Sequence, residues 1–156
     1  MVARTETPAV QSLEMLKNEQ IQAPIDIVWE TLLEQIGPAS EGEHGPMPMK
    51  LEAWPGGRWY RDLGNDTGHF WGHVQVIKPP KLLELCGPMF MSYAATSHVQ
   101  YRLAEEGSGT LLKCSYTAIG LIKQEHREGV EMGWSEELQK VREAAEKKAA
   151  QRRGKN

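Results

Sequence analysis

Residues 109–149, GTLLKCSYTAIGLIKQEHREGVEMGWSEELQKVREAAEKKA, combine the two patterns that decide the fold. Residues 110–119 alternate between apolar and polar side chains, which predicts a strand with one buried face. From about residue 124 to residue 153 there is no proline, and helix-forming residues are abundant, so one long C-terminal helix is predicted. Its apolar stripe, at steps of three and four, is Val130, Trp134, Leu138, Val141, Ala145 and Ala149.

The chain before this stretch is predicted to form a short helix and then a series of strands. Pro24 precedes apolar residues at helical spacing over residues 25–36, and Gly37-Pro38 ends that run. A Gly- and Pro-rich loop covers residues 37–48. Turn sequences such as Pro55-Gly56-Gly57 then separate short alternating segments. The expected strands are 16–23 before the helix and 49–54, 58–63, 69–77, 82–86, 93–103 and 110–119 after it.

These elements predict an α+β fold. Short turns require antiparallel neighbours, and helices at both ends of such a meander must cover one face of it. We therefore expect a curved antiparallel sheet of about six strands against the long C-terminal helix, with one short helix after the first strand. A flexible N-terminus is expected for residues 1–12 and a single domain for residues 13–153, since 156 residues support one sizeable core.

Composition excludes several classes of protein. With 40% hydrophobic and 25% charged residues, the chain is typical of globular proteins. A net charge of -3 and a pI of about 6.0 offer no field that attracts nucleic acid. No apolar run is long enough for a membrane span or a signal peptide, so a cytoplasmic protein is expected. We expect a monomer or a homodimer.

The five histidines do not have the spacing of a metal site. His69 and His73 lie on a predicted strand, where four residues span about 13 Å, too far for one ion. His98 is in the solvent-facing phase of its strand. His44 either lies in a solvated loop or acts as an acid–base group at an entrance. No metal and no cofactor are predicted, and motifs for dinucleotide binding and for a serine nucleophile are missing.

Three further features have simple structural interpretations. Cys86 and Cys114 are expected to be unpaired, on strands that are not adjacent. The basic residues between 140 and 156 either complement the helix dipole or contact a protein or an anionic lipid. The parity of residues 69–77 is open: Val74 and Val76 can point inward, whereas an inward Trp71 requires a bulge.

Several short motifs, in this order, resemble a known superfamily. They are Ala23-Pro24 with Val28-Trp29 and Leu32; Pro55-Gly56-Gly57-Arg58-Trp59; Gly72, Val74 and Val76 before Pro79-Pro80-Lys81-Leu82; Gly109-Thr110-Leu111-Leu112; and Gly133-Trp134 with Leu138. Together they resemble the START-like helix-grip (SRPBCC) superfamily, in the branch of polyketide cyclases and dehydrases and of the heat-shock-ATPase activator domain. Cys86-Gly87-Pro88 departs from relatives that carry an aromatic residue there.

The resemblance implies an apolar cavity between the sheet and the long helix. The expected function is binding of a small, largely apolar organic molecule, with no fixed catalytic set to transfer. The alternatives are a cofactor-independent cyclase or dehydratase acting on a polyketide-like substrate, and a co-chaperone-like interaction module. Gly133 would either let the backbone approach a neighbour closely or leave space at the cavity mouth. The expected ligand-binding side chains are Met49, Leu51, Trp59, Leu85, Val99, Tyr101, Cys114, Tyr116, Val130, Trp134 and Leu138.

Overall fold

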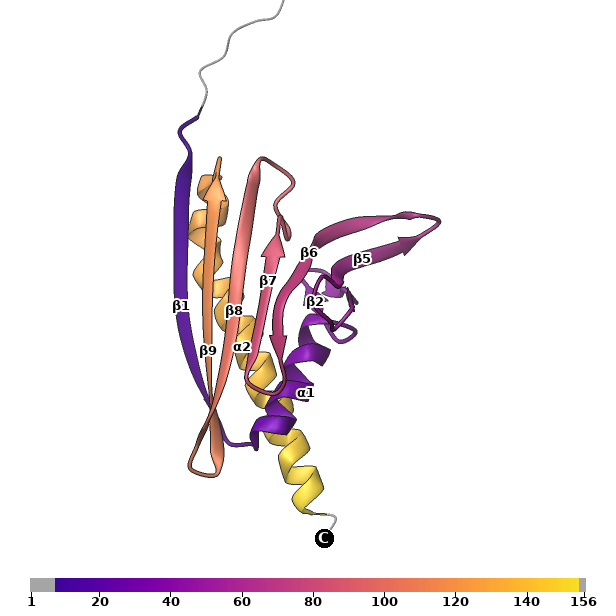
Figure 1. Cartoon of the computed structure of the whole chain (residues 1–156), viewed down its shortest axis with the longest axis vertical. Coiled ribbons are helices and arrows are strands. Elements are labelled where there is room, and N and C mark those ends of the chain that lie inside the picture. Colours follow the sequence, from indigo (N-terminus) through magenta and orange to yellow (C-terminus); the bar gives the residue numbers. More distant parts are fainter. Residues whose placement is uncertain (1–7, 155–156) are drawn as a thin grey trace, which may run out of the picture.

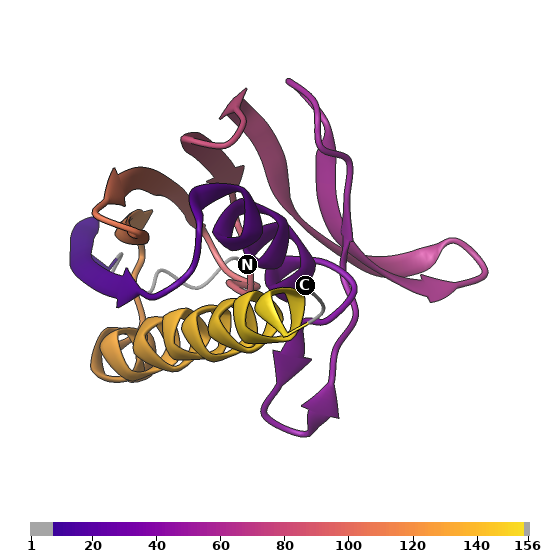
Figure 2. The ribbon, with the colours of Figure 1, turned by 90° about the horizontal axis from the view of Figure 1, so that it is seen from below.

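The computed structural model describes residues 8–154 and contains one large antiparallel sheet with both main helices on the same face (Figures 1 and 2). The helices are α1 (Ile25–Ile36) and α2 (Gln124–Arg153). The strands of the sheet are β1 (Gln11–Ile21), β4 (Lys50–Leu51), β5 (Arg58–Gly64), β6 (Thr67–Lys78), β7 (Leu82–Gly87), β8 (Ala95–Glu106) and β9 (Gly109–Gly120). Their order is β1-β9-β8-β7-β6-β5-β4.

This architecture confirms the predicted fold class. The sheet has seven strands where about six were expected, and both helices lie where the sequence predicted them. The Gly- and Pro-rich loop contains a small additional hairpin, β2 (Glu41–Gly42) and β3 (Gly45–Pro46). The β5–β6 hairpin extends away from the helices (Figure 1). In residues 8–154 no helix is long and apolar enough to cross a membrane.

The first strand begins earlier than the sequence predicted. Gln11 already pairs with Gly120, and the inward side chains of β1 include Leu13 and Met15, opposite Ala118 and Tyr116 of β9. Leu16, from which the predicted strand started, is 79% exposed. The weak alternation of this segment misled the prediction because Leu16 points outward, whereas the charged Lys17 and Glu19 are on the inward phase of the strand. Residues 1–7 of the expected flexible N-terminus lie outside the described residues.

The core lies between the sheet and α2. All six residues of the predicted stripe are buried, and the helix packs against α1 and β1 as well as against inward side chains of β8 and β9. Trp134 packs against two fully buried tyrosines, with ring centroids 6.3 Å from Tyr101 and 5.1 Å from Tyr116. Burial of this face supplies most of the stability of such a helix, because isolated helices are marginal in water.

Basic side chains near the end of α2 pair with carboxylates of other elements. Lys148 lies 2.6 Å from Glu34 of α1, and Arg152 lies 3.0 Å from Glu30 of the same helix. Arg142 pairs with Glu19 of β1. The basic C-terminal segment, as far as residue 153, therefore lies along acidic side chains of the protein's own surface.

A β-bulge decides the parity of β6. Trp59 pairs with Gly72 and Tyr60 pairs with Phe70, so Trp71 is the extra residue on β6. The bulge turns Trp71 towards the core while Val74, three residues on, is also inward and buried. A second irregularity at Gln75 lets Ile77, rather than Val76, pack against the core. The bulge that an inward Trp71 requires is therefore present.

The cysteines and the outer histidine lie as predicted. Cys86 on β7 and Cys114 on β9 are free, and β8 separates their strands. His98 is on the outer side of β8, where its Nε2 lies 2.9 Å from Glu84 Oε1. His44 is exposed in the β2–β3 turn. No group of three or more potential metal ligands occurs within the part of the chain that the structure describes.

Strands β6 and β7 approach closely at two glycines. A Cβ atom on Gly72 would lie 2.5 Å from the carbonyl oxygen of Cys86, and one on Gly87 would lie 2.4 Å from the carbonyl oxygen of Trp71. Backbone atoms cannot move aside as a flexible side chain can. Both positions therefore require glycine for the two strands to pair next to the bulge.

Replacing Gly72 with alanine is expected to lower the free energy of unfolding by at least about 2 kcal/mol, because the new methyl group collides with the β7 backbone. Urea denaturation monitored by circular dichroism measures this loss. Gly129→Ala is the matched control, since a Cβ atom there has no heavy atom within 4 Å. It should raise stability by about 0.5–1 kcal/mol through helix propensity. Equal effects of the two substitutions would contradict the close-approach argument.

Candidate functional site

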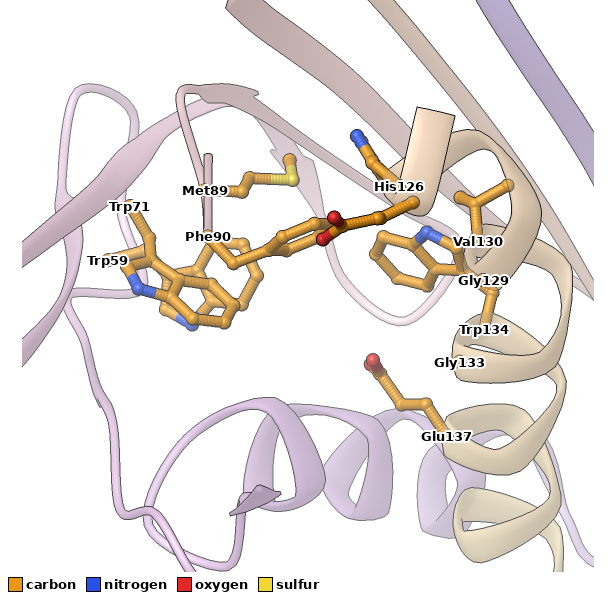
Figure 3. Close-up of a pocket in the computed structure, with 11 residues that line it drawn as sticks. Trp59, Trp71, Met89, Phe90, His126, Gly129, Val130, Gly133, Trp134 and Glu137 are labelled. Carbon is orange, nitrogen blue, oxygen red and sulfur yellow. The ribbon is translucent and has the colours of Figure 1, made fainter. Parts of the chain in front are cut away.

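A cavity of about 360 Å³ opens between α2, the β5–β6 hairpin and the segment after β7 (Figure 3). Its walls are mostly aromatic and aliphatic, and its polar groups are few. A cavity of this size and character is typical of sites for small organic molecules. The lining residues are Trp59, Trp71, Met89, Phe90, Glu125, His126, Gly129, Val130, Gly133, Trp134 and Glu137.

A second cavity of about 310 Å³ adjoins the first. Trp59, Trp71, Gly133 and Glu137 line both. The remaining wall of the second cavity comes from the end of α1, the β2–β3 hairpin and the next turn of α2. Lys140 of α2 reaches this hairpin, with its Nζ 3.3 Å from Glu41 Oε2. The two cavities therefore share part of their wall, and together they are called the cleft below.

One face of α2 provides more than half of the first cavity's lining. Residues 126, 129, 130, 133, 134 and 137 recur at steps of three and four, which places them on one side of a helix. Two of these residues, Gly129 and Gly133, have no side chain, and a Cβ atom at either would meet open space. The helix wall is therefore recessed between Val130, Trp134 and Glu137.

Aromatic rings form a continuous arc along the cavity. Ring centroids lie 5.1 Å apart for Trp59–Trp71, 6.0 Å for Trp71–Phe90 and 4.8 Å for Phe90–His126. The arc continues through Tyr116 to Trp134. Most of these pairs have the edge-to-face geometry that aromatic quadrupoles favour. The rings therefore support one another in an open arrangement rather than collapsing into the cavity.

Local backbone features position the two indoles at the far side of the cavity. Trp59 donates its Nε1–H to the carbonyl oxygen of Ile36 at 2.8 Å, which also satisfies the end of α1. Trp71 is turned inward by its bulge. Its carbonyl oxygen accepts the N–H of Met89 at 2.8 Å, and Met89 adopts a left-handed φ of 54°. Such a backbone is uncommon for a residue other than glycine and is often found at functional sites.

Glu137 extends from α2 into the cavity (Figure 3). The Tyr101 hydroxyl donates to its Oε1 at 3.1 Å. Burial away from water raises the pKa of Glu137 to about 7, and the Tyr101 hydrogen bond and the nearby Lys140 charge only partly oppose this shift. Tyr101 is itself fully buried, and burial followed by the Glu137 charge raises its pKa. Near neutral pH the Glu137 carboxyl can therefore either accept or donate a proton.

His126 belongs to a second polar network at the other end of the cavity. Its Nδ1 lies 3.0 Å from the Tyr93 hydroxyl and its Nε2 lies 3.2 Å from the Tyr116 hydroxyl. Ser97 donates its hydroxyl to Tyr116 at 2.9 Å. Burial, and then the Arg127 charge, lower the pKa of His126, while burial raises that of Tyr116 to about 12.

Glu137 and His126 do not act on one atom. They are eleven residues apart on α2, which corresponds to about 16 Å along the helix axis. Each is instead paired with its own tyrosine from the sheet. The first cavity therefore has an aromatic middle, with Glu125 and His126 towards one end and Glu137 towards the other, an arrangement that can orient an elongated molecule.

Three of the eleven expected ligand-binding residues line this cavity, namely Trp59, Val130 and Trp134. Tyr101 and Tyr116 lie behind Trp134, and their hydroxyls are engaged by Glu137 and His126 rather than left free for a ligand. The other six lie in the core or against it, and none of them lines either cavity. These are Met49, Leu51, Leu85, Val99, Cys114 and Leu138.

The sequence argument did not select Met89, Phe90, Glu125, His126, Gly129 or Glu137 as lining residues. A signal for the helical ones was present. His126 lies four residues before Val130 and continues the apolar stripe, and Gly129, Gly133 and Glu137 follow each other at steps of four beside it. Met89 and Phe90 lie in the irregular segment after β7, where no periodicity exists to assign a direction.

The pKa of Glu137 leads to a pH-dependent prediction. Since its folded-state value of about 7 is above the ordinary value of 4.5, the folded protein holds this proton more tightly than the unfolded chain does. The resulting stabilisation is present at low pH and is lost as the pH rises through 7. Glu137→Gln keeps the shape without the charge. Its advantage in unfolding free energy over the wild type should therefore grow by about 2 kcal/mol between pH 5 and pH 8.

Urea denaturation at several pH values measures this difference. Glu131→Gln, on an exposed position of α2, makes the same change of charge and should give a constant difference from the wild type. Parallel stability curves for Glu137→Gln and the wild type would contradict the assignment.

Solved structures with the same fold are available from several bacteria. An uncharacterised protein from Rhizobium leguminosarum has a TM-score of 0.67 at 16% identity, over 89% of this chain and 97% of that one. CalU16 from Micromonospora echinospora has a TM-score of 0.59 at 21% identity, over 87% and 81%. Mll3558 from Rhizobium loti has a TM-score of 0.66 at 15% identity, over 87% and 99%. At such identities the likeness shows the fold.

One family model covers most of the chain. It is described as activator of Hsp90 ATPase homolog 1-like protein, and it matches residues 22–146, from the residue after β1 to a point within α2. Among curated proteins, none matches. The family model and the solved structures agree with the START-like helix-grip superfamily that the sequence resembles. The chain therefore belongs to the activator of Hsp90 ATPase homolog 1-like family.

Proposed function

We propose that this protein binds a small, largely apolar organic molecule in the cleft between the sheet and α2. The observation that carries the proposal is the cavity of about 360 Å³ lined by Trp59, Trp71, Phe90, Val130 and Trp134. Aromatic and aliphatic walls with a few polar groups are the usual composition of small-molecule sites. The fold of the family supports this proposal, since domains of this fold commonly bind hydrophobic ligands.

The glycines of α2 also support binding. Each glycine in a helix interior costs about 1 kcal/mol relative to alanine. Gly129 and Gly133 face open space, so neither is required by a close neighbour. Their effect is to leave the cavity unfilled, which has no structural benefit but provides room for a ligand.

The two alternatives have less support. An interaction module would need a filled interior and an extended exposed apolar patch, whereas this domain has an open cleft. An enzyme would need two titratable groups close to one reacting atom, whereas Glu137 and His126 are about three helical turns apart. A single acid–base step by Glu137 with Tyr101 is compatible with the cleft, and it would also require that an organic molecule binds first.

Substitutions at Gly133 test whether the cavity is the binding site. The probe is N-phenyl-1-naphthylamine, an uncharged fluorescent molecule whose emission rises in apolar surroundings. Gly133→Leu should place its side chain in the shared wall of both cavities and weaken probe binding by about tenfold or more, because the space is lost. Gly133→Ala should leave binding within about threefold of the wild type while stabilising the helix by about 1 kcal/mol.

Comparing Gly133→Leu with Gly133→Ala separates an effect on probe binding from an effect on stability. If both variants are as stable as the wild type and both bind the probe equally well, the probe occupies another place and the cavity assignment is wrong. Native mass spectrometry of freshly purified protein can at the same time detect a molecule that copurifies with the wild type and is missing from Gly133→Leu.

Trp134 is expected to be part of the cavity wall as well as part of the core. One side packs against Tyr101 and Tyr116 and another borders the cavity. Trp134→Ala should therefore cost about 2–3 kcal/mol, less than the roughly 3–5 kcal/mol for an aromatic residue packed on all sides. Trp134→Phe should weaken probe binding. Unchanged affinity in Trp134→Phe would show that the indole does not border the bound molecule.

A further inference from the structure

The two cavities meet at a junction formed by two indoles, a carboxyl group and a position without a side chain. These are Trp59, Trp71, Glu137 and Gly133, which line both cavities. In Figure 3 the two indoles and the Glu137 carboxyl border the same open space. A ligand in either cavity would border this shared wall. Its composition therefore bears on the chemistry of the bound molecule.

The indoles at the junction are held nearly at right angles. The planes of Trp59 and Trp71 make an angle of 75° at a centroid distance of 5.1 Å. The N–H of Trp59 is already donated to Ile36 and only 3% of Trp59 is exposed, so the half-buried Trp71 offers the larger accessible π surface. Aromatic faces attract organic cations, and aromatic cages are a common means of binding quaternary ammonium groups.

The surroundings of the junction are acidic. In addition to Glu137, the two cavities are lined by Glu41, Glu43, Glu125 and Glu136. Among the described residues that line them, Lys140 is the one lysine or arginine, and its ammonium group is 3.3 Å from Glu41. An anionic ligand would meet repulsion without a free cation to pair with, whereas a cationic ligand would be attracted.

Glu137 has no cation as a close partner. Tyr101 donates to its Oε1, and no hydrogen bond from a residue in the described range engages Oε2. Within that range, every side-chain nitrogen or oxygen atom that is closed off from solvent has a hydrogen-bond partner. Because Oε2 has no such partner, it must be accessible to solvent in the cleft. The Glu137 carboxyl group is partly removed from water, which raises its pKa, and the nearby Lys140 charge opposes this shift only in part. A positive charge on the ligand would supply the missing partner.

We infer that the bound molecule carries an organic ammonium group, seated at the junction between Trp59, Trp71 and Glu137. Its apolar part extends into the cavity of about 360 Å³ towards Phe90 and Trp134. This inference rests on the proposed function, because it names the chemical class of the molecule that the cleft binds. It adds the charge of the ligand and the residues that recognise this charge.

A pair of probes that differ only in charge tests the inference. Phenethyltrimethylammonium and (3,3-dimethylbutyl)benzene have the same shape, with a quaternary nitrogen in the first and a carbon atom in the second. Each is used to displace N-phenyl-1-naphthylamine from the wild-type protein at pH 8. The cation should bind at least about tenfold more tightly than its uncharged isostere, through the indoles and the carboxylate.

Two variants assign this preference to the junction. Glu137→Gln should weaken binding of the cation by about tenfold and change binding of the isostere by less than about threefold. Trp71→Leu should also weaken cation binding more than isostere binding, and it provides a second test that does not depend on Glu137. Glu131→Gln, on exposed α2 surface outside both cavities, is the control for net charge and should change neither affinity.

The possible failures are distinguishable. If neither probe displaces N-phenyl-1-naphthylamine and that molecule does not bind either, the proposed function itself is wrong. If the uncharged isostere binds as tightly as the cation or more tightly, the cleft is a binding site for neutral molecules and the inference is overturned. If Glu131→Gln reduces cation binding as much as Glu137→Gln does, the attraction is a general surface effect, and the junction does not recognise the charge.

Discussion

The packing of Trp134 against Tyr101 and Tyr116 keeps α2 away from the sheet, and the cleft depends on this separation. Helices approach their neighbours more or less closely according to the size of the side chains between them. The buried stripe of α2 ends in Ala145 and Ala149, where the helix lies against α1 and β1. Large residues at one end of the stripe and small ones at the other thus create an opening at the large end, next to β5 and β6.

Several unfavourable local features occur around this opening. They include the bulge at Trp71, the left-handed backbone of Met89, two glycines in the middle of a helix and a carboxyl group with a raised pKa. Each reduces stability slightly, and proteins generally concentrate such features at functional sites. Elsewhere the domain follows the ordinary rules, with a buried stripe, regular pairing along β8 and β9, and basic side chains paired at the end of α2.

The sequence predicted the fold better than the site, for physical reasons. Periodicity reports which face of an element is buried, so α1, α2 and the alternation around Tyr116 could be recognised. Periodicity does not report where a buried face ends and a cavity begins. Leu85 and Val99 were therefore predicted to bind a ligand together with Trp59. A bulge changes the direction of a side chain without changing the residues around it. The inward position of Trp71 therefore had to remain open until the pairing of β5 and β6 was known.

The contact between Lys140 and Glu41 has a consequence for how quickly the cleft can exchange its contents. This pair joins the β2–β3 hairpin to α2 across the second cavity, and both side chains are largely exposed. Exposed ion pairs contribute less than about 1 kcal/mol and are screened by salt. Thermal fluctuations therefore break the contact frequently. For a molecule bound as proposed, entry and departure on this side would require only a local displacement of the hairpin, and their rates should depend on ionic strength rather than on unfolding of the domain.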